Sequence, residues 1–130
     1  MSRDVASQLD AAYQRAKKAF LDEDLVASME LFAPELEFVQ ADGKVIDYTQ
    51  MRRNVEVQMS RVRDMVGSYQ RISLAIDGDR GTEVRVQDAW TDFFSSKRWW
   101  RIKRTLRIHW AEKATGWKIV RVKVLREKVI

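Results

Sequence analysis

Apolar residues in the first part of the chain recur at intervals of three and four, the spacing of one face of a helix. Val5, Leu9, Ala12 and Ala16 lie on such a face and predict an amphipathic helix over residues 3–21. The acidic tripeptide that follows breaks the pattern, so this helix is expected to end there.

A shorter helix and a small hairpin are expected next. The helix spans residues 25–33, because Asp24 can accept hydrogen bonds from its free amides and Pro34 cannot continue it. Residues 35–40 then alternate between two faces, as in a strand. Asp42-Gly43 is a hairpin turn signal and precedes a short return strand.

A third helix is predicted over residues 48–65. Asp47 and Gln50 have the spacing of a capping box, in which each side chain satisfies a free backbone amide of the other residue. Gly67 is the expected end of this helix, because glycine tolerates the backbone conformation of a helix C-terminus.

The second half of the chain alternates with a period of two residues, which is typical of strands. The expected strands are 68–77, 82–94, 98–110 and 117–126. Short turns, including one at 95–97, join them, so an antiparallel meander is expected. The predicted fold class is α+β: one domain over residues 1–130, with three helices packed on one face of a strongly bent antiparallel sheet.

Charge is distributed unevenly along the 130 residues, whose formal net charge is +5. The net charge is −5 for residues 1–50, zero for residues 51–96 and +10 for residues 97–130. This asymmetry fits either an anionic partner or an acidic and a basic layer that attract each other within the fold.

Composition excludes several classes of chemistry. The chain has no cysteine, which excludes disulfides and thiol nucleophiles, and His109 is its one histidine, so no metal site and no bound cofactor are expected. No apolar run is long enough to span a bilayer, and the first residues lack the apolar stretch of a signal peptide. A cytoplasmic protein without membrane contact is therefore expected.

Asp88 and Arg104 lie between apolar neighbours on the expected inner faces of two adjacent strands, and Asp92 shares the face of Asp88. If side-chain parity is preserved across their hairpin, position i faces position 192−i or 194−i, and Asp88 and Arg104 are opposite or diagonal neighbours. Asp88 is then the best catalytic candidate, able to orient or deprotonate a ligand, while Arg104 holds a carboxylate or stabilises negative charge. The alternative is a structural ion pair.

Aromatic and amide side chains complete the expected site. Trp90, Trp100 and Trp110 share the predicted inner face, where they either sandwich a flat apolar ligand or fill the core. The predicted ligand-binding residues are Tyr13, Gln40, Tyr48, Asp88, Trp90, Arg104 and Trp110.

The outer sheet face is predicted to be cationic, with Arg101, Lys103, Arg107 and His109 from one strand. The outward residues expected from the neighbouring strand are Glu83, Arg85, Gln87, Ala89, Thr91 and Phe93, and from the last strand Trp117 and Ile119. A homodimer through this face is expected, with Glu83 as an acidic partner for facing arginines. A polyanion is the remaining alternative for this face, although nucleic acid is not the expected partner because no known binding motif is present.

The order of these elements resembles that of the nuclear transport factor 2-like superfamily. Residues 25–46 (LVASMELFAPELEFVQADGKVI) look like its recurrent short helix, strand and hairpin, and residues 116–120 (GWKIV) resemble the start of the last strand in its SnoaL-like members. The resemblance implies a cone-shaped α+β fold that hosts isomerases, cyclases, dehydratases, epoxide hydrolases and non-catalytic dimerisation modules.

The catalytic residues of these branches have few counterparts here. The position of the ketosteroid-isomerase base holds Gln40, which cannot take a proton, and its helical tyrosine falls at Ala16. The Asp–Arg–Asp set of the limonene-epoxide-hydrolase branch resembles Asp88, Arg104 and Asp92 only loosely in spacing.

The resemblance therefore implies a small-molecule pocket protein, either a cofactor-independent isomerase, cyclase or hydrolase for an apolar or cyclic substrate, or a non-catalytic dimerisation or ligand-sensing module. A cavity of roughly 300 Å³ or more with Asp88 or Gln40 at its wall favours ligand binding. A cone filled by its tryptophans favours the module.

Overall fold

The computed structural model of the chain describes residues 2–95 and 99–130. Within these ranges the elements are α1 (Ser2–Leu21), α2 (Leu25–Met29), β1 (Phe32–Val39), β2 (Val45–Ile46), α3 (Tyr48–Arg61), β3 (Val62–Asp77), β4 (Arg80–Phe93), β5 (Trp99–Lys113) and β6 (Gly116–Val129). The predicted turn at 95–97 lies largely outside the described residues.

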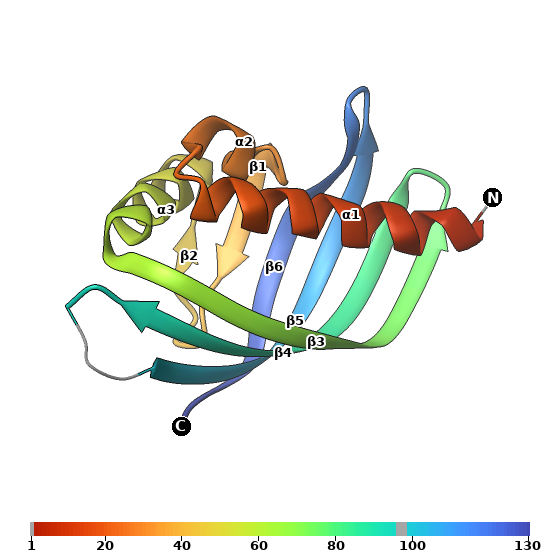
Figure 1. Ribbon diagram of the computed structural model, residues 1–130. Coiled ribbons are helices and arrows are strands. Elements are labelled where there is room, and N and C mark those ends of the chain that lie inside the picture. The colour runs from red at the N-terminus through yellow and green to blue at the C-terminus, as the bar shows by residue number, and fades with distance from the viewer. Residues whose placement is uncertain (1, 96–98) are drawn as a thin grey trace.

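The strands form one mixed sheet in the order β2-β1-β6-β5-β4-β3. β3 to β6 are consecutive antiparallel neighbours, as the alternating pattern predicts, while β1 pairs with β6 in parallel. The sheet is strongly bent, with α1 lying across one side of it and α2 and α3 gathered near β1 and β2 (Figure 1). The α+β class expected from the sequence is confirmed.

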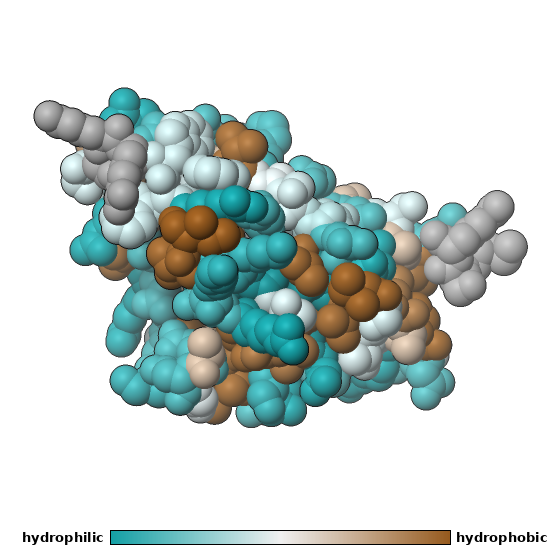
Figure 2. Space-filling view, turned by 90° about the horizontal axis from the view of Figure 1, so that it is seen from below, coloured by the Kyte–Doolittle hydropathy of each residue, from teal (hydrophilic) through white to brown (hydrophobic). Residues whose placement is uncertain are grey.

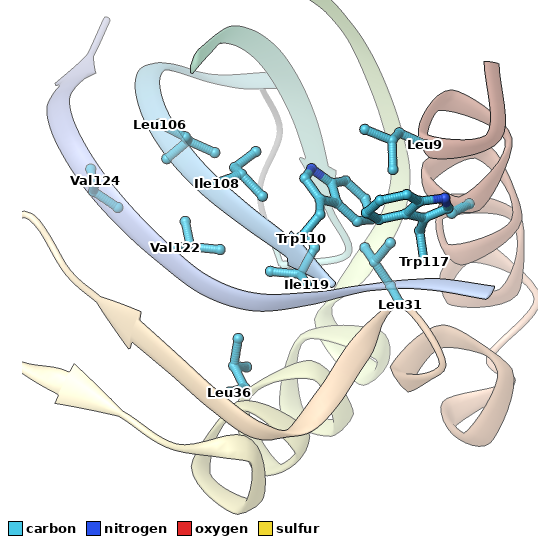
Figure 3. Close-up of a cluster of buried hydrophobic side chains, with 11 residues drawn as sticks. Leu9, Leu31, Leu36, Leu106, Ile108, Trp110, Trp117, Ile119, Val122 and Val124 are labelled. Carbon is cyan, nitrogen blue, oxygen red and sulfur yellow. The ribbon is translucent and has the colours of Figure 1, made fainter. Parts of the chain in front are cut away.

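The hydrophobic core lies between α1, β1 and the inner face of β5 and β6. Leu9 of α1 points toward the rings of Trp110 and Trp117, and Ile108 and Ile119 continue the cluster along the two strands (Figure 3). Leu9, Ile108 and Trp110 are completely buried. This end of the fold is therefore filled with side chains.

The second helix is shorter than its pattern predicts. It ends at Met29, and Pro34 lies inside β1 instead of ending a helix. The pairing of β1 with β6 shifts register between Phe32 and Glu37, which removes the ladder hydrogen bond that proline cannot donate. The expected N-cap is present, since the Asp24 side chain accepts a hydrogen bond from the Ala27 amide.

The third helix begins as predicted and ends early. Asp47 Oδ1 accepts a hydrogen bond from the Gln50 amide at 2.9 Å, and Gln50 Oε1 accepts one from the Asp47 amide at 3.0 Å, so the capping box is confirmed. The helix ends at Arg61, because the chain from Val62 onward pairs with β4. Gly67 lies within β3, where long antiparallel pairing outweighs the helical pattern.

None of the helices in the described part of the chain is both long enough and apolar enough to cross a membrane.

Candidate functional site

The register of β4 against β5 decides which side chains enter the fold. Gln87 lies opposite Arg104, and Asp88 lies opposite Lys103. The expected parity is wrong by one residue, and a shift of one residue moves every side chain of a strand to the other face. The residues of β4 expected outside, Glu83, Arg85, Gln87, Ala89, Thr91 and Phe93, therefore lie on the inner face.

Asp88 lies on the outer face and does not meet Arg104. Its carboxylate accepts two hydrogen bonds from Arg101, from Nε at 2.8 Å and from Nη2 at 2.6 Å. The Arg101 hydrogen bond holds the pKa of Asp88 below its usual range, with help from the nearby Lys103 charge. Trp90, expected inside, is exposed and lies under the Arg101 guanidinium, 5.2 Å from its carbon. The predicted positions of Asp88 and Trp90 on the inner face are therefore wrong.

Arg104 does lie on the inner face, but its partner comes from β6. Its Nε donates a hydrogen bond of 2.6 Å to Glu127 Oε2. Gln40 lies on the wall of the same cavity as this pair. Two predicted ligand-binding residues are thus brought together, with a carboxylate that the sequence pattern did not single out.

A buried ionic cluster occupies the inner face of β3 and β4 beneath α1. Its members are Asp10, Tyr69, Arg71, Glu83 and Arg85. Glu83 is fully buried and accepts hydrogen bonds from Arg71 Nε at 2.6 Å and Arg85 Nη2 at 2.9 Å.

The other oxygen of Glu83 and one oxygen of Asp10 also accept hydrogen bonds. Glu83 Oε1 accepts a hydrogen bond from the indole of Trp110 at 3.2 Å. Arg71 Nη2 donates to Asp10 Oδ1 at 2.7 Å, and the Tyr69 hydroxyl donates to the same oxygen. Two carboxylates and two guanidinium groups balance each other, which makes the burial of Glu83 possible.

The guanidinium of Arg85 lies between two tyrosine rings. Its carbon is 3.9 Å from the ring centre of Tyr13 and 3.7 Å from that of Tyr69, and its side chain is 1% exposed. These are cation–π contacts of a buried guanidinium, and burial strengthens such contacts. Burial raises the pKa of the Tyr13 hydroxyl far above its ordinary value, although the Arg85 charge opposes this.

Asp10 ties α1 to this cluster. Partial burial opposes its ionisation, but hydrogen bonds from Tyr69 and Arg71 and the charges of Arg71 and Arg85 outweigh that effect, so the pKa of Asp10 is lowered. Tyr13, a predicted ligand-binding residue, packs its ring against Arg85 of the cluster and against Trp110.

A large cavity, here called the mouth cavity, opens at the other end of the cone, between α3, the β1–β2 turn and the inner face of the sheet. Its volume is about 660 Å³. Its apolar lining includes Phe20, Phe38, Met51, Val55, Phe93 and Ile102.

Polar groups reach the mouth cavity from several elements. Gln40, Asn54 and Gln58 contribute amides, Asp42 contributes a carboxylate from the β1–β2 turn, and the Arg104–Glu127 pair contributes charges on the sheet side. Among the described residues, Arg104 makes no further hydrogen bond, so its terminal amino groups remain available to a ligand oxygen.

A second cavity, here called the side cavity, lies between α1, α2 and the inner face of β3 and β4. Its volume is about 290 Å³, and its walls include Tyr13, Tyr69 and Arg85. Met65 belongs to the walls of both cavities. The two tyrosine rings and Arg85, which make the cation–π contacts, thus also line the side cavity.

The other predicted residues have structural positions. Trp110 is completely buried in the core, and Tyr48 packs against the same core cluster. Trp100 is 39% exposed beside the β4–β5 connection and lies opposite Thr91. The tryptophans therefore do not fill the wide end of the cone.

The last strand also differs from its expected faces. Trp117 and Ile119, predicted outside, are buried, because the pairing of β5 with β6 shifts register between His109 and Trp110. His109 lies on the outer face as expected, and burial together with Arg121 and Arg107 lowers its pKa.

No group of three or more histidine, cysteine, aspartate or glutamate side chains that could hold a metal ion is found in residues 2–95 and 99–130.

Comparison with known proteins identifies the fold. No protein-family model and no curated protein matches the sequence. Among solved structures, a conserved protein from Planctomyces limnophilus superposes with a TM-score of 0.86 at 12% identity, covering 100% of both chains.

Two further structures extend the comparison. A nuclear transport factor 2-like superfamily protein from Salmonella enterica gives a TM-score of 0.78 at 16% identity, over 95% of this chain and 92% of that one. A hexachlorocyclohexane dehydrochlorinase gives 0.69 at 9% identity, over 99% and 88%. At such identities the likeness establishes the fold and leaves the activity open.

The buried ionic cluster makes a first prediction about stability. Glu83→Gln keeps the shape of the side chain but removes the charge that Arg71 and Arg85 share. We expect the free energy of unfolding to fall by about 3–5 kcal/mol, since breaking a buried pair leaves uncompensated charge. Urea denaturation measures this change in the free energy of unfolding.

Glu127→Gln is the control. It removes the partly exposed pair of Arg104 and Glu127, and the expected decrease is about 1 kcal/mol or less. Equal losses in both variants would contradict the role of Glu83.

The lowered pKa of Asp10 predicts a dependence of stability on pH. The stabilisation from ionised Asp10 is complete above the unfolded-state pKa of about 3.9 and is lost as pH falls through the lower folded-state value. The wild type should therefore exceed Asp10→Asn in unfolding free energy by a constant amount above about pH 5, and by progressively less below about pH 4. A difference that does not change with pH would show that the carboxylate charge contributes nothing.

Proposed function

We propose that this chain, whose fold is that of the nuclear transport factor 2-like superfamily, binds a small, largely apolar, cyclic molecule in the mouth cavity. The volume of about 660 Å³ is the observation that carries the proposal, because ligand pockets usually measure roughly 300–1,000 Å³. Gln40 lies at the wall of this cavity, and Trp110 is confined to the closed end of the cone.

The lining favours a particular kind of ligand. Aromatic and aliphatic side chains from α1, α3 and the sheet offer contact to a ring system, whereas the charges come from the Arg104–Glu127 pair and from Asp42 on the β1–β2 turn. A ligand with a carbonyl or carboxylate oxygen would place that oxygen on the terminal amino groups of Arg104. Gln40, Asn54 and Gln58 would accept or donate hydrogen bonds at the α3 side.

The same pair suits cofactor-independent proton transfer. A carbonyl oxygen on Arg104 would be stabilised as negative charge develops on it, and the adjacent Glu127 carboxylate would take the proton from the neighbouring carbon. The likeness to a dehydrochlorinase that acts on a compact cyclic molecule supports this size of ligand. Ligand sensing without turnover is the second candidate function, favoured by Gln40, whose amide cannot accept a proton.

Filling the mouth cavity tests the proposal. Thr91 lies on the inner wall, and Thr91→Trp adds a large ring where the ligand is expected. We expect about a tenfold or greater loss of affinity for N-phenyl-1-naphthylamine, a neutral two-ring probe whose fluorescence increases in apolar surroundings. Fluorescence titration measures the affinity.

Two further variants keep this test interpretable. Thr105→Trp adds the same ring on the outer face of the sheet and should leave probe binding unchanged. Val55→Phe narrows the cavity from α3 and should also weaken binding of the probe. It replaces Thr91→Trp as the test if that variant does not fold. Equal affinity of all three variants and the wild type would refute binding in this cavity.

Arg104 is expected to select an oxygen-bearing ligand. Arg104→Gln should weaken 1-naphthoate about tenfold, since hydrogen bonds to charged groups are the strong ones, while the neutral probe binds with nearly unchanged affinity. Displacement of the neutral probe by naphthoate gives both values. The matched variant Arg107→Gln removes the same charge from the outer face, and a similar loss there would contradict the assignment of Arg104.

A further inference from the structure

The outer face of β5 and β6 carries a two-stranded row of unpaired positive charges, here called the cationic ladder. Its members are Lys103, Arg107, Arg121, Lys123, Arg126 and Lys128. All six side chains are exposed, and none forms an ion pair within 4.0 Å in the described part of the chain.

The register places like charges directly against one another. Lys103 lies opposite Lys128, and Arg107 lies opposite Lys123. Like charges facing each other across an antiparallel pair are destabilising, so this arrangement opposes folding. The positive potential also acts on His109, whose pKa is lowered by burial and by the charges of Arg121 and Arg107.

The carboxylates that border the ladder do not neutralise it. Asp88, opposite Lys103 on β4, is held by two hydrogen bonds from Arg101. Glu37 lies opposite Arg121 on β1 but forms no ion pair within 4.0 Å in the described residues. Glu83, the acid expected on this face, is buried inside the fold.

Two exposed tryptophans lie on the same face at one end of the ladder. Trp90 and Trp99 are 42% and 41% exposed, and they are diagonal neighbours, because Trp90 faces Arg101 and Trp99 lies two residues before it. Exposed aromatic rings beside cations are the elements with which proteins stack unpaired bases. Seen from below, hydrophobic residues form separate patches between hydrophilic ones instead of one continuous apolar area (Figure 2).

We propose that the cationic ladder and the two tryptophans bind single-stranded nucleic acid. Basic residues two positions apart on one strand, such as Arg126 and Lys128, are about 7 Å apart along it, and neighbouring strands are about 4.8 Å apart, which suits successive phosphates of a backbone. The rings of Trp90 and Trp99 then stack on bases that leave the backbone. A second copy of this chain is disfavoured here, because a two-fold axis would bring the same positive rows together.

The surface is separate from the mouth cavity. Arg104 and Glu127 lie on the inner face, whereas Thr105 and Arg126, their neighbours in sequence, lie on the outer one. Nucleic-acid binding is therefore independent of the small-molecule ligand, and the predicted homodimer through this face becomes a competing occupant.

Fluorescence anisotropy with a labelled oligothymidylate and a labelled oligouridylate tests the proposal. We expect binding at about 50 mM salt that weakens about 50- to 300-fold at about 200 mM, the slope for four to six neutralised phosphates on a single strand. No binding at low salt would overturn the proposal. Equal or tighter binding of a duplex would overturn the single-strand assignment, because stacking needs unpaired bases.

Charge variants locate the surface. Arg107→Glu with Lys123→Glu should weaken binding at least about tenfold at low salt and reduce the salt dependence. Arg52→Glu with Arg53→Glu makes the same change of net charge on the exposed part of α3 and should have little effect. Equal losses would attribute binding to net charge alone. The neutral variant Arg107→Gln with Lys123→Gln removes the facing charges, so it should fold at least as stably as the wild type and repeat the loss.

Aromatic variants and competing partners complete the experiment. Trp99→Leu should weaken the oligonucleotide about fivefold or more with the salt dependence unchanged, while Trp100→Leu, on the other side of the strand, should not. Tighter binding to phosphatidylserine vesicles than to either oligonucleotide would instead assign the face to a membrane. A homodimer whose formation excludes the oligonucleotide would assign it to a second copy, and either result would overturn the proposal.

Discussion

Burial of Glu83 with its two arginine partners is the constraint on which the rest of this structure depends. A fully buried carboxylate is tolerated only where opposite charges and hydrogen bonds replace the lost water, and Arg71, Arg85 and Trp110 supply them. These partners come from three different strands. The cluster is satisfied only when those strands are in the observed register, so the ionic contacts and the sheet pairing specify each other.

The cluster also divides the interior of the cone. Tyr13 and Tyr69 lie on either side of Arg85, and the side cavity that they line, at about 290 Å³, is less than half the size of the mouth cavity. The larger mouth cavity lies at the other end, between α3, the β1–β2 turn and the sheet. The Arg104–Glu127 pair, Asp42 and three amides interrupt the apolar lining there. The wide end therefore offers both contact area and polar groups for recognition.

The two faces of the sheet consequently serve different chemistry. Along β5 and β6, residues that point inward are mostly aliphatic, whereas the outward ones are cationic. The uneven charge of the sequence is thus not an acidic layer facing a basic one in the fold. The positive charges of the C-terminal strands remain exposed and oppose each other across the ladder, which is a cost in stability that an anionic partner would remove.

Local patterns were sufficient for the elements themselves. Period and capping residues predicted α1, the capping box of Asp47 and Gln50, and the four C-terminal strands, because each depends on neighbours in sequence. Alternation on β5 also placed Arg104 inside and Lys103 outside. The early end of α3 was decided by pairing of Val62 and its neighbours with β4, a contact that no local signal specifies.

The site depended on tertiary structure. Alternation shows that Asp88 and Arg85 lie on opposite faces of β4, but it does not say which face is inside, and hydrophobicity favoured the valines and Trp90. The charged face is the inner one because Asp10 from a distant helix and Arg71 from β3 are there to satisfy it. Sequence thus determined the strands and their alternation, whereas long-range ionic partners decided the register, and with it the residues that surround the cavity.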